Sequence, residues 1–300
     1  MARAAATEIG SSPDRVLVSS TGVIGVQLPI DIIERGIQGI SRDLQDDPLV
    51  GAEGIMTTDT HPKALSARVP GSDATITWVA KGSGMIEPNM ATMLAYIFTD
   101  AALDAPALDR LLRHAVRDSF NMLSVDSDTS TSDTCAILAN GLAGHVDEAA
   151  FAETLNAGCV RMTEMLARDG EGAEHLIRAT VRGAASEDDA RRIAKSLVNS
   201  PLVKTMVHGA DPNVGRLLMA VGKCFECTVR PEATDASING YAVVRGGRRL
   251  EFDDATVRST LRADVVDLEV SLGIGTASAR AYGCDLTKGY IDENAAYYSS

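Results

Sequence analysis

The 300-residue chain lacks features that mark several large classes of protein. No run of 18 or more apolar residues is present, which argues against a membrane-spanning helix. Lysine and arginine number 28 against 41 acidic residues, a net charge of −13, whereas a nucleic-acid binder needs basic patches to neutralise phosphates. Aromatic residues make up only 4% of the chain, with one tryptophan, so aliphatic side chains must build most of the core.

Cysteine is also scarce, and its spacing is irregular. The five cysteines are Cys135, Cys159, Cys224, Cys227 and Cys284. An odd, scattered set fits free thiols in a reducing compartment, and no apolar signal segment is visible at the N-terminus, so we expect a cytoplasmic protein. The C-x-x-C spacing of Cys224 and Cys227 has no second cysteine pair beside it, so we interpret the two as small buried side chains.

Motifs for common cofactors and metals are missing as well. Gly273 and Gly275 form a G-x-G without the third glycine of a dinucleotide site. The polar run 126–134 alternates acids and hydroxyls but lacks the glycine and the terminal glutamate of a calcium loop. None of the five histidines lies in a G-x-S-x-G or H-E-x-x-H context. We therefore predict no cofactor and no metal, and the polar run is either a turn or the lining of a pocket for a zwitterionic substrate.

Strand-like and helix-like patterns alternate along the chain, without a regular βαβ order, which predicts an α/β fold whose sheets are not purely parallel. The strands that we expect lie at 15–19, 54–58, 74–79, 92–98, 135–139, 176–181, 241–244, 265–272 and 277–283, with a further one near Thr228. The expected helices lie at 29–40, 107–123, 147–167, 187–198 and just after 213. The sequence shows no repeat and no linker between domains.

A glycine-rich turn, 81–84, stands shortly before Thr92, which opens an apolar, strand-like run. A threonine hydroxyl is a weak nucleophile. If the Ala91–Thr92 peptide bond were cut, Thr92 would carry a free α-amine beside its own hydroxyl, and this amine could act as the base. By spacing alone, a strand after a tight turn is the more common explanation of the pattern.

Thr21 and Gly22 follow the first expected strand and precede the first helix. A hydroxyl and a backbone N–H at such a junction can point at one spot, as an oxyanion hole requires. A plain strand-to-helix turn is the alternative. Similarly, Arg216 at the start of a helix could bind a substrate carboxylate or could simply be exposed.

Taken together, these segments resemble the ornithine acetyltransferase family, the bifunctional glutamate N-acetyltransferases of arginine biosynthesis. The resemblance runs from about residue 15 to the C-terminus and rests on an ordered set of motifs: Ser20-Thr21-Gly22-Val23-Ile24-Gly25, Thr57-Thr58-Asp59-Thr60, Lys81-Gly82-Ser83-Gly84, Pro88-Asn89-Met90-Ala91-Thr92-Met93-Leu94, Asp128-Thr129-Ser130-Thr131, Asp169-Gly170-Glu171-Gly172-Ala173, Gly209-Ala210-Asp211-Pro212-Asn213 and Gly283-Cys284-Asp285-Leu286-Thr287.

The resemblance implies a layered helix–sheet–sheet–helix arrangement similar to N-terminal-nucleophile enzymes, but with the family's own topology. It implies one unit over residues 1–300, self-processed into an α chain, 1–91, and a β chain, 92–300, which associate, as a heterotetramer. Thr92 would be the nucleophile, exposed by cleavage after Ala91, and Thr21 and Gly22 would form the oxyanion hole. The residues implied to contact the substrate are Thr58, Lys81, Thr92, Glu171, Asn294 and Ser299.

The implied reaction moves an acetyl group from N-acetylornithine to glutamate through an acetyl-threonine intermediate, and some relatives also use acetyl-CoA. Two other functions stay open at this stage: an amidohydrolase or aminopeptidase with the same nucleophile, and an inactive, truncated paralogue. The second is raised by the short stretch before Thr21, where family members usually carry a longer segment. Further departures from the family pattern are Glu174-His175 in place of Thr-Lys, and Val214 in place of Trp.

Overall fold

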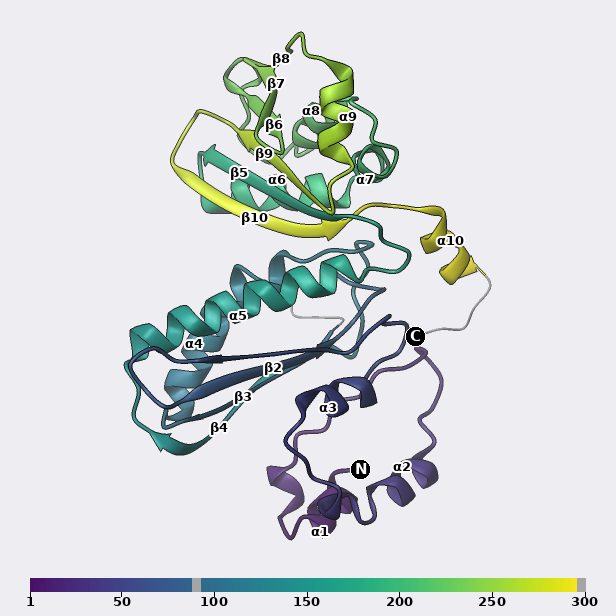
Figure 1. Cartoon of the computed structure of the whole chain (residues 1–300), viewed down its shortest axis with the longest axis vertical. Helices are drawn as coiled ribbons and strands as arrows, with labels where there is room; N and C mark the ends of the chain where they lie inside the picture. Colours follow the sequence, from purple (N-terminus) through teal and green to yellow (C-terminus); the bar gives the residue numbers. More distant parts are fainter. Residues whose placement is uncertain (88–92, 296–300) are drawn as a thin grey trace.

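The computed structural model describes residues 1–87 and 93–295 and shows an α/β protein built on two β-sheets (Figure 1). A four-stranded sheet belongs to the first half of the chain and a six-stranded sheet to the second half. One long helix lies between the two sheets and contacts both. The predicted α/β class, with two sheets and covering helices, is thereby confirmed.

The four-stranded sheet has the order β1-β2-β3-β4. Its strands are β1 (Lys63–Arg68), β2 (Thr75–Lys81), β3 (Leu94–Ala101) and β4 (Thr134–Gly144). The first three are antiparallel and β4 runs parallel to β3. In β2, Ile76 and Trp78 are buried and alternate with more exposed threonines, which is the period-2 pattern that predicted this strand.

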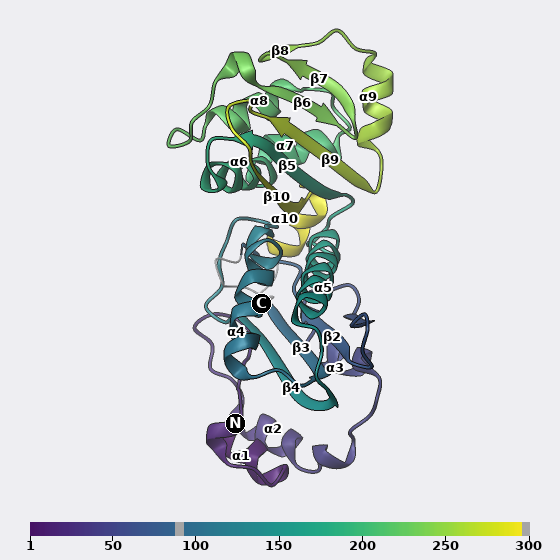
Figure 2. The same cartoon turned by 90° about the vertical axis from the view of Figure 1, so that its left-hand side faces the viewer.

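Two helices, α4 (Ala105–Arg117) and α5 (Glu148–Arg168), cover this sheet and run side by side in Figure 2. Each begins at an aspartate whose side chain accepts a hydrogen bond from a backbone N–H of the first turn: Asp104 in α4 and Asp147 in α5. A Cβ at Gly158 of α5 would lie 2.1 Å from the Trp78 ring. The glycine therefore lets the helix approach the sheet closely.

The six-stranded sheet has the order β10-β5-β9-β6-β7-β8. Its strands are β5 (Leu176–Ala184), β6 (Asp235–Ile238), β7 (Tyr241–Arg245), β8 (Arg248–Arg249), β9 (Val265–Ser271) and β10 (Ala277–Cys284). Its helices are α6 (Glu187–Asn199), α7 (Pro201–His208), α8 (Gly215–Gly222) and α9 (Asp254–Leu261), and α10 (Lys288–Ala295) follows the last strand. The buried side chains of α5 join the two sheets into one continuous core.

The first 56 residues pack much less tightly than the rest. They contain α1 (Ala2–Glu8), α2 (Ile30–Ile37) and α3 (Pro48–Gly54), which lie below the four-stranded sheet in Figure 1. Only Ala6 and Ala52 are buried in this stretch, while large apolar side chains such as Leu44 and Val26 are 83% and 67% exposed.

Single 3₁₀ turns lie at Pro13–Arg15, Ile40–Arg42, Phe120–Met122 and Pro231–Ala233.

Three expected strands are wrong. Residues 16–20 have no strand partner among the described residues, so the stretch predicted at 15–19 is not a strand. Residue 54 is the last residue of α3, which starts at Pro48 under an Asp47 cap, and residues 55–58 turn rather than extend. No strand forms near Thr228, and the nearest one starts at Asp235. In each case the local sequence pattern suits a strand, but a strand also needs a second strand with which to form hydrogen bonds.

Within the described ranges, no helix is both long and apolar enough to cross a membrane. All five cysteines are free. Burial raises the pKa of the Cys159 thiol to about 12, and it also raises the pKa of Cys135. These thiols are therefore protonated packing groups, as the sequence suggested for cysteines of this kind.

Candidate active site

The candidate site begins where three neighbouring strands have their ends in register. Lys81, the last residue of β2, pairs with Leu94, the first residue of β3, and Leu94 pairs with Thr134, the first residue of β4. The residues just outside this row, including Gly82, Met93 and Asp133, therefore meet at one edge of the sheet. Residue 92 is two positions before Leu94 in the chain, but Ala91 and Thr92 lie outside the described residues.

A buried carboxylate, Glu171, gathers three segments that are far apart in sequence. The Thr58 hydroxyl donates to Glu171 Oε1 over 2.8 Å, and the Asn294 amide donates to Oε2 over 2.7 Å. The Glu171 backbone N–H donates to the Ser83 carbonyl, 2.8 Å away. Three residues implied to bind substrate are thus in direct contact, although they come from the N-terminal part, the loop after α5 and α10.

Gly84 explains how the glycine-rich turn can approach this carboxylate. A Cβ at Gly84 would lie 2.3 Å from the Glu171 carboxyl carbon, which no real side chain tolerates. The turn before residue 92 must therefore be glycine at this position, because the Glu171 carboxylate packs directly against its backbone.

Lys81 is the cation of the site. Its Nζ donates to the Thr57 hydroxyl over 2.8 Å and lies 4.0 Å from Asp59 Oδ2. Burial lowers the pKa of Lys81, and the charge of Asp59 works against that shift. A buried ammonium whose one ion pair with the described residues is as long as 4.0 Å can still attract the carboxylate of a bound amino acid.

Asp133 provides a group that titrates near neutrality. Burial raises the pKa of Asp133 to about 7, even though the charge of Lys81 lowers it. Its Oδ2 is buried and has no hydrogen-bond partner within the described part of the chain. A carboxyl group with such a pKa can hold or release a proton at physiological pH.

Beneath Lys81 lies a buried ionic cluster that we call the Lys63 cluster: Lys63, Asp59 and Asp169. Lys63 Nζ is 2.7 Å from Asp59 Oδ1 and 2.5 Å from Asp169 Oδ2. Burial alone would raise the pKa of Asp59, but hydrogen bonds from Lys63 and from the Gly82 N–H bring it below its ordinary value. Since Asp59 holds Gly82 and Asp169 stands two residues before Glu171, the Lys63 cluster fixes both halves of the site.

A cavity of about 260 Å³ opens beside Glu171. Its lining residues are Ile24, Gly84, Met85, Asp126, Asp128, Thr129, Glu171, Tyr290 and Asn294. Asp126 shapes one wall, because its two carboxylate oxygens accept from the N–H groups of Met85 and Ile86, and burial raises its pKa despite these bonds. The cavity has the size and the polar lining of a pocket for a small amino acid.

The residues expected from the sequence are distributed as follows. Thr58, Lys81, Glu171 and Asn294 lie around the Lys63 cluster and the cavity. Thr21 and Gly22 make no hydrogen bond to these residues within the described ranges; their neighbour Ile24 lines the cavity, and the Ser19 hydroxyl is bonded to that of Tyr96. Thr92, Ala91 and Ser299 lie outside the described residues.

Arg216 lies elsewhere. Its guanidinium donates to the Leu202 carbonyl over 2.9 Å and is 3.6 Å from Asp211, near the start of α8. The sequence left open whether the polar run 126–134 is a turn or the lining of a pocket, and Asp126, Asp128 and Thr129 line one. The sequence motifs include Ser83, Asp133 and Tyr290 but assign them no role in the site, because their importance depends on burial and on neighbours remote in sequence.

Comparison with known proteins decides the family. The model of the ArgJ family matches residues 1–299. The chain belongs to the ArgJ family. The arginine biosynthesis bifunctional protein ArgJ of Rhodococcoides fascians is 47% identical over 294 residues, covering 97% of this chain and 72% of that protein. The resemblance drawn from the sequence motifs is confirmed.

Other ArgJ relatives are nearly as similar. ArgJ 2 of Clostridium acetobutylicum is 45% identical, covering 97% of this chain and 75% of that protein. The glutamate N-acetyltransferase Oat2 of Streptomyces clavuligerus is 42% identical, covering 98% of this chain and 76% of that protein. A crystal structure of ArgJ from Bacillus halodurans superposes with a TM-score of 0.66 at 37% identity, covering 69% of this chain and all of that one.

Proposed function

We propose that this ArgJ-family protein is a glutamate N-acetyltransferase of arginine biosynthesis, acting on N-acetylornithine and glutamate. The proposal rests on one observation: Thr58, Lys81, Glu171 and Asn294 gather at one edge of the four-stranded sheet. Lys81 pairs there with Leu94, which follows position 92 by two residues in the chain. The names of the relatives agree, since one is a glutamate N-acetyltransferase and others are bifunctional proteins of arginine biosynthesis.

The chemistry starts with Thr92 as an N-terminal residue. After cleavage of the Ala91–Thr92 bond, the α-amine of Thr92 takes the proton of its own hydroxyl, and the hydroxyl oxygen attacks the acetyl carbonyl of N-acetylornithine. The hydroxyl of Thr21 and the N–H of Gly22 stabilise the negative charge that develops on the carbonyl oxygen. Ornithine leaves with the proton from the Thr92 ammonium, and Thr92 keeps the acetyl group as an ester.

Glutamate then enters the same pocket and takes the acetyl group, which regenerates Thr92. Lys81 holds the α-carboxylate that both substrates share, and Glu171, oriented by Thr58 and Asn294, accepts from a substrate amino group. Ser299 completes the substrate contacts in this proposal. A single pocket that serves both half-reactions gives ping-pong kinetics. No cofactor takes part, although acetyl-CoA is a conceivable second acetyl donor.

Self-processing into chains of 91 and 209 residues is part of the proposal. The solved Bacillus halodurans chain supports it, because that chain corresponds over its whole length to 69% of this one, close to the share that residues 92–300 make up. We further propose that the two pieces stay associated as a heterotetramer and work in the cytoplasm, in line with five free cysteines.

A gel and an assay on the Thr92→Ala variant test the function. The wild-type protein should run as two bands, with Thr92 as the N-terminal residue of the larger, and should form ornithine and N-acetylglutamate in equal amounts. Thr92→Ala should run as one 300-residue band without activity, while Thr92→Ser should still be cut. Release of ornithine and acetate at the same rate without glutamate would point to an amidohydrolase instead, and an uncut, inactive wild type would point to an inactive paralogue.

A further inference from the structure

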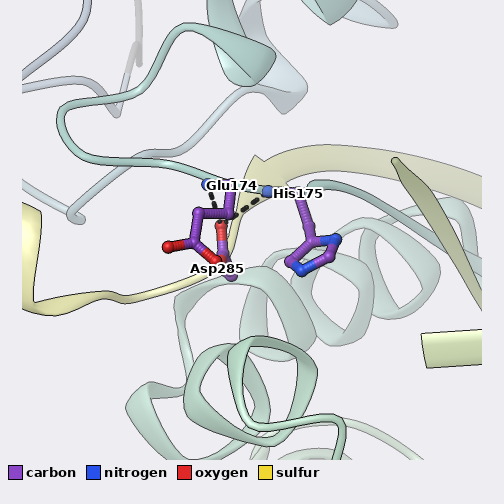
Figure 3. Close-up of side chains that lie close together, drawn as sticks. All are labelled: Glu174, His175 and Asp285. Atoms are coloured by element: carbon purple, nitrogen blue, oxygen red, sulfur yellow. Dashed lines mark hydrogen bonds between the residues drawn. The ribbon is translucent and has the colours of Figure 1, made fainter. Parts of the chain in front are cut away.

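Three side chains with metal-binding groups, those of Glu174, His175 and Asp285, lie together shortly after Glu171 in the chain, and His208 lies close to two of them. Glu174 and His175 directly precede β5, Asp285 directly follows β10, and His208 is the last residue of α7. One donor atom each of Glu174, His175 and Asp285 lie within 4.8 Å of one another. Figure 3 shows the Glu174 and His175 side chains on the same side of their loop, around the carboxylate of Asp285.

Asp285 has one oxygen that is well bonded and one that is not. Its Oδ1 accepts from the backbone N–H groups of Glu174 and His175, both over 2.9 Å. Its Oδ2 is buried, in a side chain with no exposed surface, and has no hydrogen-bond partner within the described ranges. A buried oxygen without a partner is costly, and an ion is one of the few groups that would satisfy it.

His208 places a second atom without a hydrogen-bond partner among the described residues beside these carboxylates. Its Nδ1 is buried, lacks a hydrogen-bond partner among the described residues, and lies 3.3 Å from Asp285 Oδ2 and 3.5 Å from Glu174 Oε2. Four ligands at about 2.1 Å from a tetrahedral ion are about 3.4 Å apart. The two distances that join His208 Nδ1 to the carboxylate oxygens are therefore those of neighbouring ligands on one metal ion.

His175 is held in the tautomer that a metal ligand needs. Its Nδ1 lies 2.8 Å from the Ala263 carbonyl oxygen, which can only accept, so Nδ1 carries the proton. The lone pair is then on Nε2. A second ring nitrogen bonded to a backbone carbonyl is the usual support of a metal-ligating histidine.

We propose that Glu174, His175, His208 and Asp285 form a structural Zn²⁺ site. Two imidazoles and two carboxylates suit Zn²⁺, whereas Mg²⁺ and Ca²⁺ prefer sites made only of oxygen. The ion would also neutralise the two carboxylates that now stand close together. Sequence motifs missed this site because its ligands come from three distant segments.

The position of the site suggests what the ion does. Glu174 is three residues after Glu171, and two residues after Asp285 the Thr287 hydroxyl donates to the Gly172 carbonyl over 2.7 Å. Zn²⁺ would tie the loop of Glu171 to the segment that leads into α10, which carries Asn294. The ion would therefore position the Glu171–Asn294 pair without touching the substrate.

Titration of the full, EDTA-treated protein with Zn²⁺ tests the site directly. Isothermal titration calorimetry should show one Zn²⁺ per chain, Co²⁺ in its place should give the visible absorption of a tetrahedral site, and Zn²⁺ should raise the melting temperature. His208→Gln and His175→Gln should each weaken binding at least about tenfold. None of these readouts depends on acetyl transfer, so they stand apart from the test of the proposed function.

Two matched controls make the result specific. His114→Gln changes an exposed histidine of α4 and should leave Zn²⁺ affinity unchanged. The double variant Cys224→Ser, Cys227→Ser removes the other pair of plausible zinc ligands and should also bind normally. The proposal is overturned if the wild type shows no saturable Zn²⁺ binding, or if the cysteine variant alone loses the ion.

Discussion

The carboxylates of the Lys63 cluster and the carboxylate of Glu171 are all buried, but they are held in opposite ways. In the Lys63 cluster, Asp59 and Asp169 share a cation at 2.7 and 2.5 Å. Glu171 is equally buried, but only the neutral donors of Thr58 and Asn294 contact its carboxylate, and no ion pair joins it to the described residues. In the Lys63 cluster a lysine ammonium therefore compensates the carboxylates. The carboxylate of Glu171 has no such cation among the described residues, and we infer that the ammonium group of a bound substrate pairs with it.

Removing the cation of the Lys63 cluster should have the largest effect on stability. In Lys63→Met, two buried carboxylates lose their cation, so the free energy of unfolding should fall by about 3–5 kcal/mol. Urea denaturation followed by circular dichroism measures this. Lys223→Met, which changes an exposed lysine, should stay within about 0.5 kcal/mol of the wild type. A loss as small as that of the control would mean that the cluster contributes little.

A substitution of Glu171, whose carboxylate has no cation beside it within the described ranges, should affect catalysis more than folding. Glu171→Gln keeps the shape and removes the charge, so the free energy of unfolding should change by about 1 kcal/mol or less. A charge-assisted hydrogen bond to substrate worth about 1.5–3 kcal/mol predicts a drop of about 10- to 100-fold in kcat/KM. Steady-state kinetics on the cleaved protein give this ratio. Glu153→Gln, at an exposed position of α5, is the matched control, and equal kinetics for the two variants would contradict the inference.

We expect the smallest effect on stability from Asp133, which is half-buried and has one carboxylate oxygen without a hydrogen-bond partner among the described residues. Its pKa of about 7 in the folded protein is above that of an unfolded aspartate, so the folded state binds the proton more tightly. Stability should therefore fall as pH rises from about 4 to about 7, by about 1 kcal/mol once partial exposure is allowed for.

Asp133→Asn should remove this pH dependence. Urea denaturation of both proteins at pH 5 and pH 8 measures the difference, and Asp73→Asn, at a side chain 91% exposed, should keep the wild-type profile. Parallel profiles for wild type and Asp133→Asn would show that Asp133 titrates in its ordinary range.

Local patterns in the sequence predicted the elements that carry their own signals. The helix α6 starts at the Ser186 cap and β2 shows its alternation, and both lie where expected. The strands expected at 15–19 and 54–58 failed because pairing requires a partner strand, which no local pattern encodes. The helix expected after Pro29 forms, but its apolar side chains are not buried.

The candidate site likewise has residues that sequence motifs identify and properties that only the folded structure reveals. Thr58, Lys81, Glu171 and Asn294 could be named from the family motifs, and the structure brings them together. The pKa of Asp133 and the unsatisfied oxygen of Asp285 depend on burial by residues remote in sequence, so a motif could not have indicated either.

The register of the four-stranded sheet has a consequence for a cut at Ala91–Thr92. Strands β1 and β2 precede the cut and β3 and β4 follow it, while β2 and β3 pair from Ile76 with Thr99 to Lys81 with Leu94. The break would therefore fall inside one sheet rather than between two domains. Release of the shorter chain would leave β3 as a bare edge strand and remove Trp78 from its place against α5. Two polypeptides would thus share one fold, and neither would be a folding unit on its own.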